Sequence, residues 1–592
     1  MADFSTVKVA DPVIGDVTDK LIFGVKSGAS SSTYQTFPVT SPSNSSLVWQ
    51  ISVPSENVVV DRRVLMRSGM TLTLYVDNLA GNLVVGSRVF EYGLTDSFAS
   101  FPLSKSFVTQ TAGINNCNIS VNTKDVLPAL LRLNDSRELY RFNSMTCSLP
   151  DQAYGKYSDS IRATNSPLAS FNTQSYDLDQ TPRGAFPAVV ECLQFTAAGV
   201  YVNNSNVVAA ATNTFRITVA SIFTEPIFVA PFIWSDSEYN NQGLLGINTM
   251  SLNCVTDGTL SRVWSSGTSN ITRIVAGAVG APAGGASIFA ANPSLYTCQF
   301  SIASMNSGMS QPAALFRFLS SQPTDMLKTR NVCPWLDYAR YIQSQGVTTI
   351  AGGGSAVLTS SNIQLSSIPD RLVICVRKQM SAQTIQDPDM WLACTGLSVN
   401  FNNSSGLLSS ATISDLYAIS RKGGSTQSFG EFCGQQWNTT VGGVYGNIPT
   451  TGSLIVLQPA FDFGLPTYLS SSSLGSFNLQ FTISVYNQLA VPVNAEICVI
   501  AIQGGLIVSQ QGLTTTFQGL LSRATTLEAM VSKDSDVESA RSLDRLTGGG
   551  RMFMGARKRI TGGAMSAGAY SGGAASGGGM SGGARSRLES LC

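Results

Sequence analysis

NVVVDRRVL (57–65), TLTLYV (71–76) and TAGINNCNISVN (111–122) form, with the helix-like DVLPALLRL (125–133), one unit between Pro54 and Leu133. A weaker copy follows as IPDRLVIC (368–375), TGLSVNF (395–401) and a short helix-like segment from Ser414 to Arg421. Both copies place an Asp-Arg pair in a β-branched run, then a Gly-started strand that ends near Asn, then a short helix. A chain that repeats a unit of this size is interpreted as two similar domains.

The strand pattern extends over most of the chain. A length of 592 residues exceeds what one hydrophobic core supports, so two domains of about 200 to 250 residues are expected. Short β-branched runs between Gly, Asn, Pro and Ser are typical of all-β sandwiches or barrels. We predict a Ser-rich N-terminal arm (1–45), a first sandwich (46–240), a second sandwich (241–511) and a C-terminal region (512–592). FRITVA (215–220) and LQFTISV (479–485) are predicted to be equivalent strands.

Three local features are expected within these domains. The pair Asp61-Arg62 is interpreted as a strand-end ion pair on a solvated face rather than a ligand site. Asp125 is predicted to cap the first helix, and Ser414 or Asp415 the second, which then ends at Gly423. The turn-rich segments 135–185 and 265–290 are predicted to be long loops.

The composition excludes several classes of function. Charged residues make up 12% of the chain and the net charge is +1, so the whole chain is not an electrostatic nucleic-acid binder. Histidine is absent, which excludes Ser-His-Asp and Cys-His catalysis and removes the commonest metal ligand. The eleven cysteines form no Cys-x-x-Cys pair, so neither a zinc site nor a disulfide scaffold is expected. We predict no enzyme activity, catalytic residue, cofactor, metal or membrane span.

The C-terminal region has a different chemistry. Thr516 to Leu546 is predicted to be an amphipathic helix, because apolar residues recur in a segment almost free of Gly and Pro. From Gly548 the chain is a Gly/Ser/Ala-rich tail that cannot build a core. Its six basic residues, against the single acidic Glu589, give a net charge of +5 and are candidate contacts to phosphate or acidic partners: Arg551, Arg557, Lys558, Arg559, Arg585 and Arg587.

The tail also carries a repeated Gly-Gly pattern. LTGG (546–549), ITGG (560–563) and MSGG (580–583) share an apolar residue two positions before two glycines. This pattern resembles the recognition sequence of adenovirus-type maturation proteases, which implies cleavage after Gly549, Gly563 or Gly583. IAGG (350–353) and IQGG (502–505) also match, but they fall in the predicted folded part and are expected to be protected.

The order of these segments resembles the major capsid proteins of virophages and polinton-like viruses, in the double jelly-roll lineage that includes the adenovirus hexon. The resemblance covers about residues 45–510. It rests on the following strand and turn segments, in this order: Pro54–Leu65, Phe101–Asn116, Thr224–Ile227, Gly246–Met250 and Ile363–Arg371.

The resemblance implies an all-β chain of two tandem eight-stranded jelly-roll sandwiches, with short helices in loops. It further implies a virion capsid protein, assembled in the host cell, whose homotrimers of pseudo-hexagonal outline tile an icosahedral shell. The implied partners are neighbouring capsomers, penton and minor capsid proteins, a viral cysteine protease acting on the tail, and genome or scaffold contacts of the tail. The loops 135–185 and 265–290 would then form outer towers.

Three other functions remain open from the residues alone. A carbohydrate-binding or adhesin β-sandwich would fit the low charge, but no signal peptide precedes it. A polysaccharide-degrading enzyme would need a carboxylate pair, and Asp387, Asp389 and Asp462 are more simply interpreted as surface-turn residues. A penton or spike protein is the third alternative, although the internal repeat favours the double form.

Overall fold

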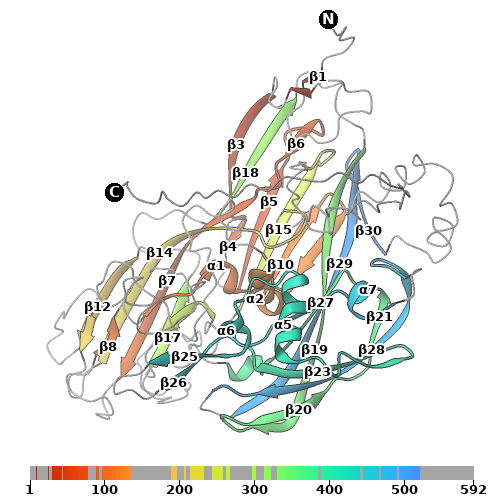
Figure 1. Cartoon of the computed structure of the whole chain (residues 1–592). Helices are drawn as coiled ribbons and strands as arrows, with labels where there is room; N and C mark the ends of the chain where they lie inside the picture. The colour runs from red at the N-terminus through yellow and green to blue at the C-terminus, as the bar shows by residue number, and fades with distance from the viewer. Residues whose placement is uncertain are drawn as a thin grey trace, which may run out of the picture. The chain divides into compact units, whose positions relative to one another are not determined.

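The computed structural model is built mainly of antiparallel strands, with a few short helices (Figure 1). The residues that it describes are 8–9, 24–25, 30–42, 45–77, 88–91, 96–134, 188–195, 206–208, 214–232, 243–257, 262–266, 296–301, 312–321, 330–383, 389–439, 445–465, 469–489 and 492–519.

Two antiparallel sheets form the first half of the described chain. One has the strand order β11-β10-β15-β5-β4, and the other has β12-β14-β7-β18-β3 with β6 and β17 attached. The strands of the first sheet are β4 (Ser41–Pro42), β5 (Ser46–Ser52), β10 (Phe107–Ile114), β11 (Cys117–Val121) and β15 (Thr249–Thr256). Those of the second are β3 (Ser30–Pro38), β6 (Val58–Val60), β7 (Leu65–Asp77), β12 (Val189–Phe195), β14 (Thr214–Pro226), β17 (Tyr296–Ser301) and β18 (Ala313–Ser321).

Two further antiparallel sheets form the second half. Their orders are β19-β29-β22-β27, with β30 attached, and β20-β28-β23-β24, with β21 attached. The first contains β19 (Arg330–Ile350), β22 (Arg371–Lys378), β27 (Ile455–Leu457), β29 (Val493–Gln510) and β30 (Leu513–Gln518). The second contains β20 (Ser355–Thr359), β21 (Ile363–Ser367), β23 (Ala393–Phe401), β24 (Ser404–Leu407) and β28 (Leu474–Tyr486).

Short helices and two-stranded ribbons complete the described structure. The helices are α1 (Pro102–Lys105), α2 (Thr123–Leu133), η4 (Met380–Ala382), α5 (Ile413–Lys422), α6 (Phe429–Phe432) and α7 (Pro459–Asp462). The ribbons are β1 (Lys8–Val9) with β2 (Gly24–Val25), β8 (Arg88–Glu91) with β13 (Asn206–Val208), β9 (Asp96–Phe98) with β16 (Trp264–Ser266), and β25 (Gln435–Thr439) with β26 (Tyr445–Pro449).

The two halves repeat the same eight-stranded topology. The order β11-β10-β15-β5 of the first half recurs as β24-β23-β28-β20, and β14-β7-β18-β3 recurs as β27-β22-β29-β19. In each half a short helix follows the same hairpin, α2 after β10 and β11, and α5 after β23 and β24. The predicted double jelly roll is therefore confirmed.

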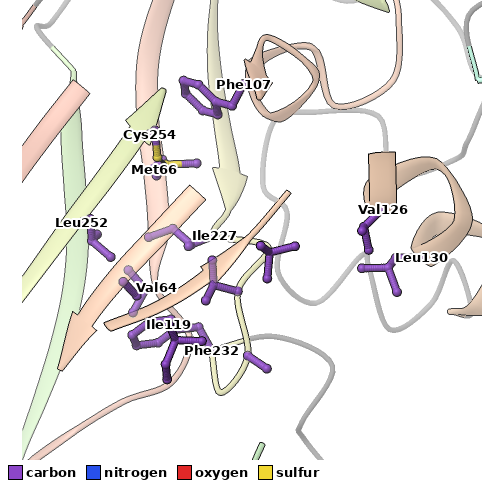
Figure 2. Packing of buried hydrophobic residues seen from close by; sticks show 14 of the residues in the cluster. Val64, Met66, Phe107, Ile119, Val126, Leu130, Ile227, Phe232, Leu252 and Cys254 are labelled. Atoms are coloured by element: carbon purple, nitrogen blue, oxygen red, sulfur yellow. Dashed lines mark hydrogen bonds between the residues drawn. The ribbon is translucent and has the colours of Figure 1, made fainter. Parts of the chain in front are cut away.

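Alternating side chains build the two cores. Along β5 and β28 buried positions alternate with more exposed ones, as expected for strands with one face inward. In the first half, Cys254 of β15 packs against Met66 of β7, with 3.6 Å between their sulfur atoms (Figure 2). In the second half, side chains from both sheets, such as Ile483 of β28 and Val499 of β29, share one apolar cluster.

The strand pairing moves the predicted domain borders. β15 pairs with β5 and β10, and β18 pairs with β3 and β7, so both strands belong to the first sandwich although they follow residue 240. The first sandwich therefore extends to Ser321, and the second begins with β19 at Arg330. The predicted N-terminal arm also contributes, because β3 pairs with β18 along its whole length.

Two expected elements are wrong in detail. β28 is not the equivalent of the strand that contains residues 215–220. In the second sandwich β28 lies next to β23, as β15 lies next to β10 in the first sandwich, so β28 is the equivalent of β15. The strand that contains residues 215–220, β14, is the equivalent of β27. The helix predicted from Thr516 does not begin there, because residues 513–518 form β30 and pair with β29. Residues 520–546, the loop expected at 135–185 and residues 267–290 of the loop expected at 265–290 lie outside the described residues, whereas residues 265–266 belong to β16.

Candidate functional site: the junction of the two sandwiches

Helix α2 lies at the junction of the two sandwiches. It begins at Thr123, and its N-cap is Asn122, whose Oδ1 accepts the N–H of Asp125 at 3.2 Å. Its apolar side, with Val126 and Leu130, packs into the first core (Figure 2). Asp125 was predicted to be the cap, but its side chain is free for another role because Asn122 caps the helix.

The carboxylate of Asp125 joins the halves through a buried ion network. Its Oδ1 accepts a hydrogen bond from Arg377 Nη2 on β22 at 2.5 Å, and its Oδ2 contacts Arg340 Nη1 on β19. Arg377 Nε donates in turn to Glu496 Oε1 on β29 at 2.6 Å. Arg377 is 4% exposed, so its charge depends on these two carboxylates for compensation. Nearby negative charges, including Glu496, raise the pKa of Arg377 although burial opposes them.

The C-terminal end of α2 is held in the same way. Arg132 Nε lies 2.6 Å from Glu431 Oε1 of α6, and both side chains are buried. The backbone carbonyl of Arg132 accepts the N–H of Thr426 at 2.7 Å and its hydroxyl at 2.8 Å. Both ends of one helix of the first sandwich are therefore bound to the second sandwich.

A second ion cluster lies around Asp389, in the segment that leads into β23. Its Oδ2 is 2.7 Å from Lys105 Nζ of α1, and its Oδ1 accepts a hydrogen bond from Arg262 Nε at 3.0 Å. Although burial would raise it, these two cations hold the pKa of Asp389 well below its ordinary value. The carboxylate is therefore ionised near neutral pH, which keeps this contact between the halves charged.

Next to this cluster, Glu225 of β14 holds α1 in place. Its two carboxylate oxygens accept the backbone N–H groups of Leu103 at 3.0 Å and Ser104 at 2.7 Å. Complete burial raises the pKa of Glu225 to about 7, against the lowering effect of the Ser104 and Leu103 hydrogen bonds and of Lys105.

The last described strand completes the junction. Asn115, in the β10–β11 turn, donates from Nδ2 to Thr514 Oγ1 of β30 at 2.9 Å, and the N–H of Thr514 donates to Asn116 Oδ1 at 2.8 Å. The N–H of Gly512 donates to the carbonyl of Gly246 at 3.1 Å. The C-terminal strand of the second sandwich is thus bonded to two turns of the first.

The apolar core is continuous across the junction. One cluster of buried side chains contains Trp49 and Phe223 of the first half together with Trp335, Val373 and Ile500 of the second. Apolar burial provides the non-directional attraction, while the ion pairs fix the relative orientation of the halves. This arrangement links the two similar sandwiches through a shared apolar core, buried ion pairs and hydrogen bonds.

Several predicted site residues can be placed. Asp61 accepts the N–H of Arg63 and pairs with Arg317 at 3.4 Å, whereas Arg62 is buried; the predicted solvated Asp61-Arg62 pair is wrong. In α5 the cap is Thr412, in a capping box with Asp415, and the predicted end at Gly423 is confirmed. The predicted tail residues lie outside the described residues: Gly549, Gly563, Gly583, Arg551, Arg557, Lys558, Arg559, Arg585 and Arg587.

The two internal Gly-Gly matches lie in folded structure. Residues 502–505 are buried within β29, and residues 350–353 end β19 and enter the turn before β20. In that turn Gly353, with a φ of 69°, donates its N–H to the carbonyl of Asn487 at 2.9 Å. A protease cleft needs an extended chain that is not paired with another strand. Residues 502–505 are paired within the sheet, and the Gly353 hydrogen bond holds its segment in a turn.

Among the residues that the structure describes, no group of three or more His, Cys, Asp or Glu side chains is placed to hold a metal ion. Within the same ranges, the helices are too short or too polar to cross a membrane. Seven cysteines are free thiols: Cys117, Cys254, Cys333, Cys375, Cys394, Cys433 and Cys498.

Comparisons with known proteins agree with this architecture. Residues 2–301 match the family model of the Sputnik virophage major capsid protein first domain, and residues 338–505 match that of the major capsid protein V20 C-terminal domain. The chain belongs to the virophage major capsid protein family. It is therefore a structural component of the virion capsid.

Individual virophage proteins show the same likeness. The chain is 27% identical to the putative capsid protein V20 of Sputnik virophage over 562 residues, covering 92% of this chain and 84% of that protein. A chain of the Sputnik virophage cryo-EM structure matches with a TM-score of 0.67 and 24% identity, over 87% of this chain and 93% of that one. The mavirus major capsid protein matches with a TM-score of 0.57 and 14% identity, over 86% and 93%.

Proposed function

We propose that this capsid protein assembles as a homotrimeric capsomer that tiles an icosahedral shell. The observation that carries the proposal is the junction, which fixes two sandwiches of equal topology in one orientation. Three such subunits related by a closed three-fold axis present six similar sandwiches around a ring. A ring of this kind has a pseudo-hexagonal outline and fits positions of six-fold packing.

Lateral contacts between trimers, and contacts with penton and minor capsid proteins, follow from the same role. The low charge of the chain supports these contacts. Charged residues make up only 12% of the chain, and many identical copies with more charge would repel one another. These contacts are expected to be weaker than those within the trimer.

Light scattering on the recombinant chain tests the trimer. The full chain is expected to give three times 62.6 kDa, and a chain that ends at Gly519 should also form trimers. The truncation is placed after Gly519, and not before Leu513, because β30 is part of the second sandwich. A monomeric mass for both chains over a concentration series would exclude a stable trimer.

The proposal includes a role for the tail in maturation. Its net charge of +5 would attract genome phosphates or an acidic scaffold before a viral cysteine protease removes it after Gly549, Gly563 or Gly583. Intact-mass measurement on purified virions tests the cleavage, and a shortened chain that ends at one of these glycines is expected. Virions that contain only the 592-residue chain would contradict it.

Site variants locate the cleavage. Replacing each glycine in turn by valine, as in Gly549→Val, Gly563→Val and Gly583→Val, should block only the cut after that residue, because a side chain there obstructs a narrow cleft. Gly504→Val is not a suitable control because Gly504 is buried in β29. Gly568→Val is the matched control, since Gly568 lies in the tail but outside the three patterns, and it should leave every cut unchanged.

A further inference from the structure

Two cysteines lie directly opposite each other on neighbouring strands of the second sandwich. The antiparallel register pairs Cys375 of β22 with Cys498 of β29. The thiol of Cys375 donates to the carbonyl oxygen of Cys498 at 3.7 Å, and the two thiol groups also interact with each other. Among the strand pairs that the structure describes, no other places two cysteines opposite each other.

The spacing of this cysteine pair suits a disulfide bond. Directly opposite residues of antiparallel strands have Cα atoms about 4.5 to 5.5 Å apart. The Cα atoms of disulfide-bonded cysteines are usually about 4.4 to 6.8 Å apart. The side chains of directly opposite residues also project from the same face of the sheet. Cys375 and Cys498 can therefore be joined without a change of strand register.

The cysteine pair faces the first sandwich. Cys375 and Cys498 belong to the apolar cluster that spans both halves of the chain. The residues next to them on each strand, Ile374 and Val499, point the other way and belong to the cluster inside the second sandwich. The two thiols are therefore part of the junction between the sandwiches.

The ion network of the junction begins at the next residue pair on the same face. Arg377 pairs with Glu496, two residues from the cysteine pair on each strand. Arg377 donates hydrogen bonds to Glu496 and to Asp125 of α2. A covalent bond between the two cysteines would hold together the two strands that carry this network.

The cysteine pair combines reactivity with burial. Its internal hydrogen bond lowers the pKa of Cys498 against the effect of burial, and the positive charge of Arg377 acts in the same direction as the hydrogen bond. A lowered pKa favours the thiolate, which is the form that reacts with oxidants. Cys375 and Cys498 are 3% and 0% exposed, which excludes an oxidant as large as oxidised glutathione. A hydroperoxide as small as hydrogen peroxide is the kind of oxidant that suits this burial.

We propose that a small hydroperoxide converts Cys375 and Cys498 into a disulfide bond between β22 and β29. The Cys498 thiolate attacks one oxygen of hydrogen peroxide, the O–O bond breaks and hydroxide leaves, which forms a sulfenic acid. The Cys375 thiol then attacks the sulfur of this sulfenic acid, so that the S–S bond forms and water leaves. In total, two thiols lose two electrons and two protons, and one hydrogen peroxide is reduced to two molecules of water.

The oxidation state of the cysteine pair should follow the surroundings of the virion. The cell interior keeps thiols reduced, so the newly made chain is expected to carry two thiols. Outside the cell this protection is absent, and the cysteine pair is expected to be oxidised in released particles. Oxidation depends only on the fold of one chain, and not on trimer assembly or on cleavage of the tail.

Peptide mapping of the recombinant full chain tests the bond. The chain is treated with hydrogen peroxide, its remaining thiols are blocked with N-ethylmaleimide in denaturant, and it is digested without reductant by trypsin and a glutamate-specific protease. Cleavage leaves Cys375 in the peptide 372–377 and Cys498 in the peptide 497–523, each with a single cysteine. The two peptides should be recovered as one linked species that lacks two hydrogen atoms and separates on reduction.

Two variants provide the controls. Cys375→Ala removes one partner and should abolish the linked species. Cys394→Ala removes a cysteine that is buried to the same degree but lies opposite Val485, and should leave the linked species unchanged. In the full chain, free thiols at both positions after peroxide treatment would overturn the proposal. Oxygen added to Cys498 without a link to Cys375, or a link from Cys498 to any other cysteine, would also overturn it.

Purified virions test when the bond forms. Released particles that are blocked with N-ethylmaleimide should contain the linked species, whereas the chain blocked inside infected cells should contain the two free thiols. Free thiols in released particles would overturn oxidation outside the cell.

Thermal unfolding tests what the bond does. The oxidised recombinant chain should unfold several degrees above the reduced chain, because the bond restrains an unfolded segment between cysteines that are 123 residues apart. Cys375→Ala should show no such rise after peroxide treatment. An equal unfolding temperature of the oxidised and reduced full chains would overturn a role of the bond in fastening the two strands.

Discussion

Helices α2 and α5 occupy the same place in the repeated topology but have different surroundings. α2 has nine buried residues among its 11, including the charged Asp125 and Arg132, whereas α5 buries only Leu416 and Ser420 of its 10. α2 lies between the sandwiches, while α5 packs against its own sandwich through β27 and β23 (Figure 1). The charged residues of α2 are buried and connect the copies, whereas Asp415, Arg421 and Lys422 of α5 are exposed.

The largest difference between the helices is expected at their carboxylates. Asp125→Ala leaves the buried Arg377 with one carboxylate partner fewer, and should lower the free energy of unfolding by about 3 to 5 kcal/mol. Asp415→Ala in α5 removes an exposed capping-box residue and should have a much smaller effect. Urea denaturation of both variants measures this, and equal losses would show that α2 does not hold the junction.

Substitutions of buried apolar residues in the two helices should destabilise different parts of the protein. Leu130→Ala and Leu416→Ala each remove a buried side chain and should each lower the free energy of unfolding by about 2 to 5 kcal/mol. Leu130 packs in the cluster that spans both halves, and Leu416 packs in the cluster of the second half. Hydrogen exchange should therefore rise in both halves for Leu130→Ala and in the second half for Leu416→Ala. An effect of Leu130→Ala confined to the first half would contradict a shared core.

The acidic residues near the junction predict a pH dependence of stability. The folded protein keeps Glu225 protonated up to about pH 7, while the unfolded chain releases this proton near the ordinary value of 4.5. Between these values the folded state binds more protons, so the contribution of Glu225 to stability is fully present below pH 4.5 and falls by about 3 kcal/mol as pH rises through 7.

Glu225→Gln is the control for this effect, because an amide does not titrate in this window. The difference in free energy of unfolding between the two proteins should change across pH 4.5 to about 7. Asp389, whose pKa is lowered, acts with the opposite sign: its contribution to stability is present above its ordinary pKa and is lost as pH falls below that value. A constant difference across the window would contradict a pKa of Glu225 that is raised by burial.

The helix ends should give the smallest effects. Gly423, at the end of α5, lies so close to β27 that an added Cβ would meet the carbonyl oxygen of Val456 at 2.7 Å. Gly423→Ala should therefore destabilise by about 1 to 3 kcal/mol. At the end of α2, Asn134 Nδ2 donates to the carbonyl of Leu130 at 2.8 Å, and Asn134→Ala should cost about 1 kcal/mol. Thermal unfolding of both variants measures the two losses of stability. A larger loss for Asn134→Ala than for Gly423→Ala would contradict the expected order.

Local pattern was sufficient to predict the strands and the repeat. The alternation in β5 and β28, and the two copies of hairpin and helix, are visible in the sequence because side-chain period reports local geometry. The border between the sandwiches was not predictable in this way. β15 and β18 return to sheets begun much earlier in the chain, and no local signal records such pairing.

The junction was missed for the same reason. Asp125 was noticed as a helix cap, yet its partners Arg340 and Arg377 are 215 and 252 residues away in sequence. The helix predicted at Thr516 is wrong because residues 513–518 pair with β29, and strand propensity agrees with this pairing, since Thr514 to Phe517 are β-branched or aromatic residues. The strand-favouring residues were visible in the sequence, but the near absence of glycine and proline after them favoured the prediction of a helix.

The distance in sequence between Asp125 and its partners also has a consequence during synthesis. A ribosome that adds about 5 to 20 residues per second needs roughly 10 to 50 s to pass from residue 125 to residue 377. For that time the nascent first sandwich lacks the arginines and the apolar surface that complete it. The newborn chain therefore has an unfinished side that only its own second half can close, and productive encounters with other copies must wait until translation has passed β30.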